Sequence, residues 1–169
     1  RRFTELLRPR GHTATSPATG GPAPGKVVLR PFYVPFANDI MRKMRLPFAW
    51  PTAAVMDATI AEQDVVHVQF PFYLGMKAIT TARRLGKPVV STFHVQAEHL
   101  LYNIGVRNQA LVEQVYRFFL RRIYDRSDHV VCPSSFPERE LVSRGLTAPT
   151  TVISNGVPPE FRPVPPGGA

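Results

Sequence analysis

Short apolar runs rich in β-branched residues alternate with segments of helical periodicity along most of the chain. Four such runs predict strands, over residues 65–70, 88–93, 130–132 and 151–154. Apolar residues at helical spacing predict helices over residues 53–62, 73–85, 111–124 and 138–143. Strands that alternate with helices in this way form a parallel sheet with helices on both faces. The pattern therefore predicts an α/β domain.

Two of the expected helices carry more specific predictions. The helix over residues 111–124 has an apolar stripe that we expect to face the core, formed by Leu111, Val115, Phe118, Phe119 and Ile123. The helix over residues 138–143 follows Ser135, which we expect to be its N-cap.

The amino-terminal third of the chain is less regular. Residues 3–10 predict the last turns of a helix that Pro9 and Gly11 end. Residues 14–25 carry no charge and predict a flexible loop, and residues 26–30 predict a short strand. Residues 31–51 contain four prolines, so we expect irregular structure there around a short helix over 38–44.

Composition narrows the class of protein. The 169 residues are 44% hydrophobic and 20% charged, as in an ordinary globular domain. A single cysteine, Cys132, excludes a disulfide framework and a cysteine-rich zinc site, and fits a reducing cytosol. No run reaches the roughly 18 apolar residues of a spanning helix, so we expect no integral membrane protein. No signal peptide is visible.

The charge is strongly positive. Lys and Arg number 21 against 12 Asp and Glu, which gives a formal net charge of +9. Such a balance suggests an anionic partner, whether nucleic acid, an acidic lipid surface or a phosphorylated ligand, although a solvated basic surface explains it equally well. The excess is almost all arginine and is spread along the chain, without the aromatic–lysine interleaving of a nucleic-acid-binding module. We therefore expect no nucleic-acid partner.

Ligands of parallel α/β sheets bind at the carboxyl ends of the strands, so the residues that follow each strand are the candidate site. His94 follows the second expected strand, and its imidazole titrates near neutral pH. Polar or aromatic residues in the other positions are candidates for substrate contacts: Gln69, Phe72, Gln96, Glu98, Ser134, Asn155 and Gly156.

Four segments in order resemble the amino-terminal domain of family 4 glycosyltransferases, which are retaining enzymes of the GT-B fold. They are residues 64–72 (DVVHVQFPF), 82–94 (ARRLGKPVVSTFH), 128–136 (DHVVCPSSF) and 152–157 (VISNGV). Arg10, Gly11 and His12 are similar to the end of that domain's first helix. The resemblance implies a Rossmann-like parallel sheet, the acceptor-side half of an enzyme that transfers a hexose from a nucleotide sugar to a hydroxyl of a membrane lipid or glycan.

The resemblance also implies what lies outside this chain. The chain starts without methionine, inside an expected helix, as a fragment would. The family's first strand and glycine-rich turn are not here, nor is the carboxyl-terminal domain that binds most of the nucleotide sugar. We interpret residues 1–163 as an incomplete domain and 164–169 as the start of an interdomain linker. We expect the fragment alone to be inactive.

By this resemblance His94 lies beside the transferred sugar, and no metal or other cofactor is needed. A structural role at the strand end is the alternative for His94, and no protein nucleophile is assigned. Gln96 and Glu98 contact acceptor hydroxyls, or Glu98 instead stabilises a helix N-terminus. For Phe72 the alternative to a contact with the acceptor is a plain turn between strand and helix. His67 lies within a strand, and we interpret it as a sheet residue rather than a ligand.

Basic and apolar residues interleave over residues 40–50. Arg42, Lys43 and Arg45 supply charge and Trp50 an interfacial aromatic, a combination typical of contact with an anionic membrane. The alternative is that the segment folds as a lid on the site. We expect a cytoplasmic protein, peripheral at the inner face of the membrane. A non-catalytic scaffold domain is the rival class, and it predicts that the residues at the strand ends do not converge.

Overall fold

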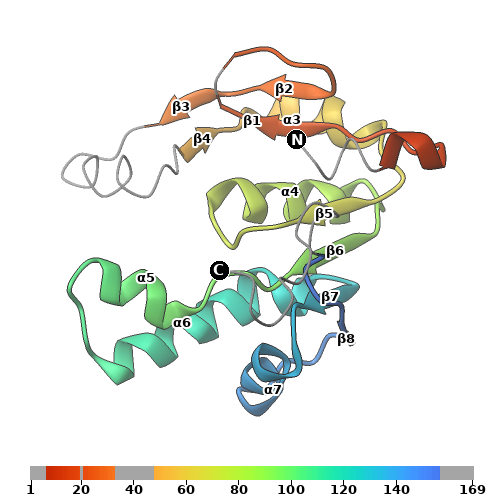
Figure 1. Cartoon of the computed structure of the whole chain (residues 1–169). Helices are drawn as coiled ribbons and strands as arrows, with labels where there is room; N and C mark the ends of the chain where they lie inside the picture. The colour runs from red at the N-terminus through yellow and green to blue at the C-terminus, as the bar shows by residue number, and fades with distance from the viewer. Residues whose placement is uncertain (1–6, 20, 33–47, 157–169) are drawn as a thin grey trace, which may run out of the picture.

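The computed structural model describes residues 7–19, 21–32 and 48–156. Their centre is a parallel four-stranded sheet whose spatial order follows the chain (Figure 1). Its strands are β5 (Val66–Val68), β6 (Val89–Thr92), β7 (His129–Cys132) and β8 (Thr150–Val152). Each step to the next strand passes through helix, which confirms the predicted Rossmann-like α/β fold.

The connecting helices follow the expected pattern with one addition. Helix α4 (Tyr73–Arg84) joins β5 to β6, and α7 (Ser135–Ser143) joins β7 to β8. Between β6 and β7 lie α5 (Ala97–Asn103), α6 (Gln109–Arg122) and the 3-10 turn η2 (Tyr124–Arg126). The short helix α5 was not predicted, because seven residues give too little periodicity to recognise.

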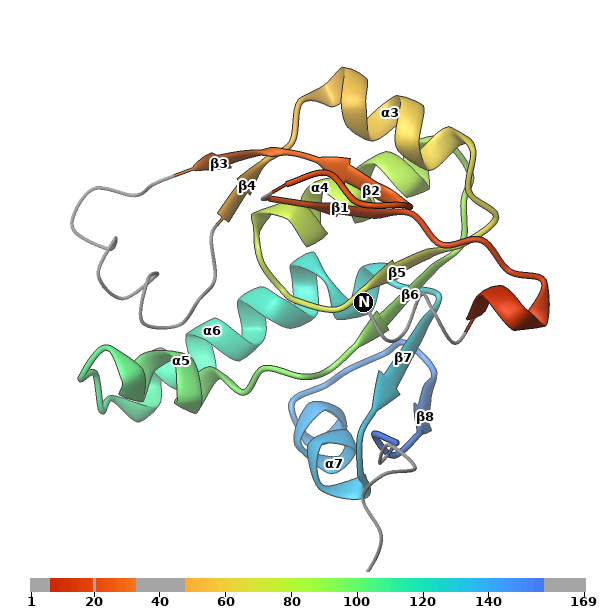
Figure 2. The ribbon, with the colours of Figure 1, turned by 45° about the horizontal axis from the view of Figure 1, so that its top comes forward.

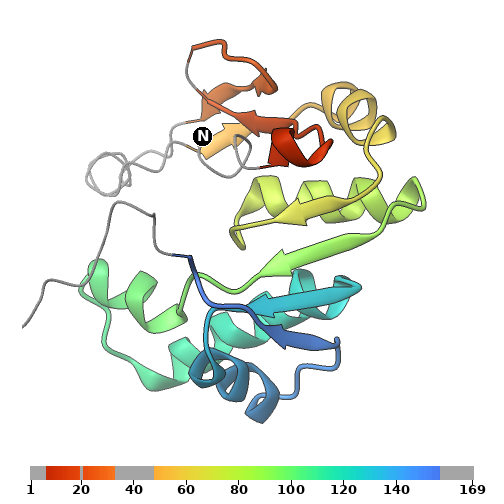
Figure 3. The same cartoon turned by 45° about the vertical axis from the view of Figure 1, so that its right-hand side comes forward.

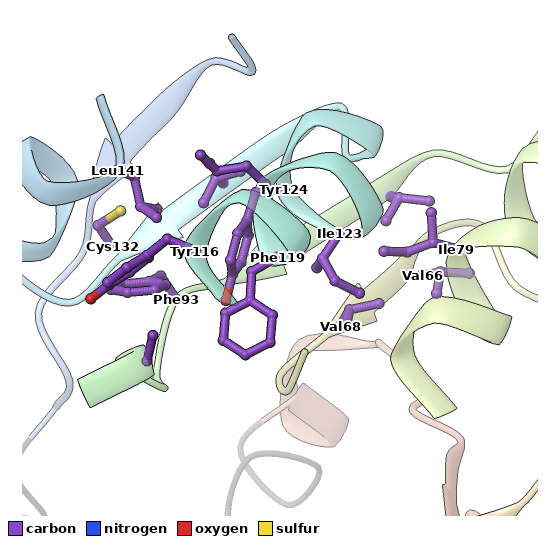
Figure 4. Close-up of a cluster of buried hydrophobic side chains, with 14 of the residues drawn as sticks. Val66, Val68, Ile79, Phe93, Tyr116, Phe119, Ile123, Tyr124, Cys132 and Leu141 are labelled. Carbon is purple, nitrogen blue, oxygen red and sulfur yellow. The ribbon is translucent and has the colours of Figure 1, made fainter. Parts of the chain in front are cut away.

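One side of the sheet packs into the core. Alternate strand residues, such as Val66 and Val68 on β5, are buried, whereas His67 between them is exposed. The buried residues join those of α3 to α7 in a single cluster. Figure 4 shows its centre, with ten residues labelled: Val66, Val68, Ile79, Phe93, Tyr116, Phe119, Ile123, Tyr124, Cys132 and Leu141.

The prediction for the face of α6 was right except at Phe118, and the predicted cap of α7 was wrong. On the expected stripe of α6, Phe119 and Ile123 are buried and Leu111 and Val115 pack against the core, whereas Phe118 is 43% exposed. The fully buried face also includes Val112, Tyr116 and Leu120. A strict 3.6-residue period from Val112 selects this face and leaves Phe118 outside. The N-cap of α7 is Ser134 rather than Ser135, because Ser134 has the extended backbone of a cap and Ser135 is already helical.

The amino-terminal part forms short elements beside the sheet (Figure 2). They are η1 (Arg8–Arg10), β1 (Ser16–Ala18), β2 (Lys26–Val28), β3 (Arg30–Phe32), β4 (Phe48–Trp50) and α3 (Ala53–Ala61). Strands β1 and β2 pair in parallel, and β3 pairs with β4 in antiparallel register.

Four predictions in this part needed correction. Pro9 lies inside η1 rather than ending a helix. Residues 16–18 form β1 instead of part of a loop, because their backbone pairs with β2, a contact that leaves no side-chain pattern. The strand expected over 26–30 is divided between β2 and β3, and residues 48–50 form a strand in a segment expected to be irregular. Residues 3–6 of the helix expected over 3–10, the helix expected over 38–44 and the linker expected over 164–169 lie outside the described residues.

A cavity of about 470 Å³ separates β1 from β5. Residues 15–19 line one side of it, residues 65–70 the other, and Met56 and Ile60 of α3 contribute to the apolar wall. Strand β5 pairs with β6 on one side and faces this cavity on the other. The cavity extends to Gln69, Phe70 and Phe72, so it adjoins the carboxyl edge of the sheet.

Candidate active site

Backbone alternation brings four polar side chains to one face of the sheet. His67 and Gln69 are two residues apart on β5 and its extension, and Thr92 and His94 are two apart on β6 and its extension. Because strand side chains alternate, both pairs lie on the side away from the buried Val66, Val68 and Phe93. The parallel register, in which His67 is opposite Val90, places the two pairs side by side.

These four residues form a continuous hydrogen-bonded chain. The Nε2 atom of His94 lies 3.1 Å from Oε1 of Gln69. The Nε2 atom of Gln69 lies 3.2 Å from Nδ1 of His67 and 3.3 Å from its Nε2. His67 Nε2 is in turn 2.6 Å from the hydroxyl of Thr92, which is buried. This hydrogen-bonded chain thus runs from the buried hydroxyl of Thr92 to the exposed imidazole of His94.

Both histidines are held in the neutral form. The His67 side chain keeps contact with solvent, but protein atoms around its ring desolvate it and lower its pKa from the ordinary value, and the nearby charge of a protonated His94 lowers it further. Burial also lowers the pKa of His94. At neutral pH each imidazole therefore has one N–H donor and one acceptor nitrogen.

Aromatic rings line the approach to His94. The rings of Phe70 and Phe72 stack with centroids 6.2 Å apart, and Phe70 lies 6.4 Å from the His94 ring. Trp50 stacks on Tyr73 at 5.5 Å. Phe70 and Phe72 thus give the polar centre of the site an aromatic border.

Gly75 fixes the loop that carries Phe70. A Cβ atom at position 75 would lie 2.5 Å from the carbonyl oxygen of Phe70 and 2.8 Å from Cγ1 of Val68. Glycine therefore allows the first turn of α4 to approach the end of β5 closely. This close packing sets the position of the backbone between Gln69 and Phe72.

The other candidates from the sequence lie farther from this centre. Gln96 is the N-cap residue of α5 and makes no side-chain cap hydrogen bond. Glu98 lies in the first turn of α5 and accepts a 2.7 Å hydrogen bond from the hydroxyl of Tyr116 on α6. Its carboxylate therefore already has a hydrogen-bond partner within the protein. Ser134, Asn155 and Gly156 are exposed and follow β7 and β8, at the other end of the same sheet edge.

The residues of the expected membrane contact are only partly described. Arg42, Lys43 and Arg45 lie outside the described residues, whereas Trp50 is 48% exposed beside Tyr73. Within the described ranges, no helix combines the length and the apolar character that crossing a bilayer requires. The same ranges contain no group of three or more His, Cys, Asp or Glu side chains suited to a metal ion.

Comparison with known proteins decides the class. The sequence model of Glycosyltransferase Family 4 matches residues 1–161. The chain belongs to glycosyltransferase family 4. This confirms the resemblance to the amino-terminal domain of that family.

One relative of this family 4 domain is the alpha-monoglucosyldiacylglycerol synthase of Streptococcus pneumoniae (strain ATCC BAA-255 / R6). It is 29% identical over 94 residues, which cover 56% of the chain and 21% of the relative. The chain thus spans about a fifth of the length of the curated relative it matches. No solved structure matches the chain.

Sequence reasoning missed the part that His67 plays in this family 4 domain. We interpreted His67 as a sheet residue, and it is one, but it is also the link between the core and the pair formed by Gln69 and His94. A signal existed in the sequence. Polar residues at spacing two end both adjacent strands, and strand alternation directs such pairs to the same face.

Proposed function

We propose that the whole protein transfers a hexose from a nucleotide sugar to an acceptor hydroxyl, with retention of configuration, at the carboxyl edge of β5 and β6. The observation that carries this proposal is the neutral His94, exposed at the strand end and hydrogen-bonded to Gln69 at 3.1 Å. A neutral imidazole can both donate to and accept from sugar hydroxyls, which suits a site where a hexose must be oriented.

In this proposal the acceptor oxygen forms a bond to the anomeric carbon while the bond from that carbon to the diphosphate breaks on the same face. The acceptor proton passes to the departing phosphate oxygen, so no protein nucleophile is required. His94 orients the hexose by hydrogen bonding, and no metal takes part. The groups that stabilise the leaving diphosphate make the largest electrostatic contribution to such reactions. We place them in a second domain, so the present chain alone is inactive.

The acceptor that we propose is a glycerolipid. Support comes from the aromatic border formed by Phe70 and Phe72, from the apolar cavity that adjoins it, and from the exposed, stacked pair of Trp50 and Tyr73. The name of the pneumococcal relative denotes a synthase of a glucosylated diacylglycerol. A lipid acceptor requires the enzyme to reach a membrane, and the basic segment over residues 40–50 is the proposed contact, on the cytoplasmic side.

Activity is tested with the full-length protein. It is incubated with UDP-hexoses or GDP-hexoses and either diacylglycerol vesicles or soluble glycans, and products are identified by mass spectrometry and the anomeric configuration by NMR. We expect a lipid product with the anomeric configuration of the donor. Turnover of glycans alone would replace the lipid acceptor in the proposal, an inverted product would overturn retention, and no transfer from any donor would overturn the proposed function.

The membrane contact has its own test. Full-length protein is co-sedimented with anionic and neutral vesicles at low and high salt, alongside a variant with Arg42, Lys43 and Arg45 changed to Ser. Each cationic side chain near an anionic leaflet contributes about 1 kcal/mol, and screening removes the effect at high salt. We expect charge-dependent binding that the triple variant loses. Binding that persists in the variant would exclude this segment as the contact.

A further inference from the structure

We infer that His67 and Gln69 are positioning residues that hold His94 as the Nε2–H tautomer and leave its Nδ1 atom as the hydrogen-bond acceptor that meets a substrate hydroxyl. The inference deepens the proposed function and rests on it for the role of the substrate. The hydrogen-bonded chain itself is a property of the folded protein and can be observed without turnover.

The first step concerns His94. Its Nε2 atom faces Oε1 of Gln69 at 3.1 Å, and a carboxamide oxygen can only accept a hydrogen bond. Nε2 therefore carries the proton. In a neutral imidazole the other nitrogen, Nδ1, then has a free lone pair. Among the described residues, Gln69 is the hydrogen-bond partner found for the His94 side chain. The exposed ring thus presents an acceptor to the site.

The second step fixes the amide of Gln69. If its oxygen accepts from His94, its nitrogen must donate to His67, whose ring nitrogens lie at 3.2 and 3.3 Å. A ring nitrogen that accepts this bond carries no proton, so His67 is neutral. With Nδ1 as the acceptor, Nε2–H of His67 donates to Thr92 at 2.6 Å. Donors and acceptors then alternate correctly along the whole chain.

The third step concerns what would disturb this order. A protonated His67 would point an N–H group at the amide N–H of Gln69. The Gln69 amide would then have to turn, and its oxygen would no longer accept the hydrogen bond from Nε2 of His94. Burial favours the neutral ring, and the lowered pKa of His67 agrees with this. Thr92, which is buried at the core end of the chain, restricts how the His67 ring can turn.

The sheet contains a matched pair that lacks this function. His129 Nε2 lies 2.7 Å from Oγ1 of Thr151, in the same diagonal arrangement on the neighbouring strands β7 and β8. The residue two positions after His129 is Val131, so no amide continues the chain. A sheet histidine bonded to threonine is therefore not enough, and Gln69 is what connects His67 to the site.

The test uses full-length protein labelled with 15N-histidine. Long-range 1H–15N spectra at pH 8 report which ring nitrogen carries the proton. We expect the Nε2–H tautomer for His94 in the wild type and a mixture of tautomers in Gln69→Leu. Gln69→Glu replaces the amide donor with a second acceptor, so the titration midpoints of His67 and His94 should both rise. His129→Ala should leave the His94 signals unchanged. Assignments come from single-histidine substitutions.

Kinetics complete the test. Gln69→Leu should lower kcat on the order of tenfold through loss of orientation, with an unchanged thermal midpoint, and Gln69→Glu should shift the acid limb of the pH–rate profile to higher pH. An Nδ1–H His94 in the wild type, or a Gln69→Glu protein with unchanged midpoints, overturns the inference even if transfer occurs. If the tautomers are as expected but the protein has no transferase activity, the inference about the hydrogen-bonded chain is supported and the proposed function is overturned.

Discussion

Two polar networks of this domain differ in charge. The chain from Thr92 to His94 is neutral and ends at an exposed ring. The second network is ionic and joins α5, α6 and α7, which lie together in the lower part of Figure 3. In it, Arg144, which follows α7, donates to both oxygens of Glu113 on α6 at 3.0 and 3.1 Å and to Glu140 at 2.6 Å.

The ionic network is enclosed by its own partners. The guanidinium of Arg144 lies 4.1 Å from the centroid of the Tyr116 ring, and its side chain is 17% exposed. The Tyr116 hydroxyl donates to Glu98 at 2.7 Å, so the network reaches α5. Every charged group in the ionic network has a hydrogen-bond partner. These bonds hold α5, α6 and α7 together and leave few groups that could bind a ligand. The neutral chain, by contrast, keeps an acceptor atom at its exposed end. The ionic network suits stability and the neutral network suits chemistry.

The largest effect should come from breaking the ionic network. Arg144→Ala removes the cation between two carboxylates and its stacking on Tyr116, and we expect the free energy of unfolding to fall by about 3 kcal/mol. Urea unfolding of the full-length protein measures this. Arg139→Ala, an exposed arginine on α7, is the control and should have little effect. Equal losses in the two variants would contradict the assignment of a stabilising role to Arg144.

The substitution His94→Ala tests the neutral network, and we expect it to affect activity rather than stability. Loss of the imidazole should lower the transfer rate of the full-length enzyme at least tenfold, equivalent to about 1.4 kcal/mol in the barrier. Stability should change little, because the ring is exposed. Steady-state kinetics and a thermal melt are compared with those of His129→Ala, which should keep both properties. Wild-type turnover in His94→Ala would remove this residue from the site.

Gly75→Ala should affect both properties. The added methyl group must displace the carbonyl of Phe70, at a cost of about 1–3 kcal/mol for overpacking. The better helix propensity of alanine offsets up to about 1 kcal/mol of this. We therefore expect a net loss of about 1 kcal/mol and slower transfer, because Gln69 and Phe70 move. Lys77→Ala on the exposed face of the same helix is the control. An unchanged rate and stability would show that the loop adjusts freely.

The smallest effect separates the networks by pH. The pKa values of His67 and His94 are lower in the folded protein than in the unfolded chain. As pH falls below about 6.5, the unfolded chain therefore binds protons before the folded protein does. The free energy of unfolding decreases over this range, until the pH reaches the pKa values of the folded protein. The hydrogen bonds from Arg144 are the main cause of the lowered pKa of Glu113, whose contribution is present above pH 4.5 and is lost below it as pH falls through the folded pKa.

Thermal midpoints between pH 8 and pH 3 should therefore decline in two stages. Substitution of both His67 and His94 by Gln should flatten the upper stage, and Glu113→Gln the lower one. A decline that starts only below pH 5 in the wild type would show that the histidines are not held neutral by the fold.

Much of this fold could be predicted from the sequence. Strands β5 to β8 and helices α3, α4, α6 and α7 have enough apolar periodicity to be recognised within a few residues. The position of His94 at a strand end followed from the same pattern. The prediction failed for β1, whose residues Ser16–Ala18 have no run of β-branched side chains, and for α5, whose seven residues are too few to show a helical period. Short elements of this kind depend on neighbours, such as the pairing of β1 with β2, and leave almost no local pattern.

The sequence by itself determined the α/β fold, the family and the strand ends at which a site can form. Those properties depend on local periodicity and on motifs that are contiguous in the chain. Tertiary structure alone decided that His67, Gln69 and His94 form one hydrogen-bonded chain. It also decided that Glu98 accepts a hydrogen bond from Tyr116 and that Phe118 lies outside the core. The reason is physical. A hydrogen bond requires atoms within about 3 Å, and only strand register and helix packing bring residues 25 positions apart to that distance.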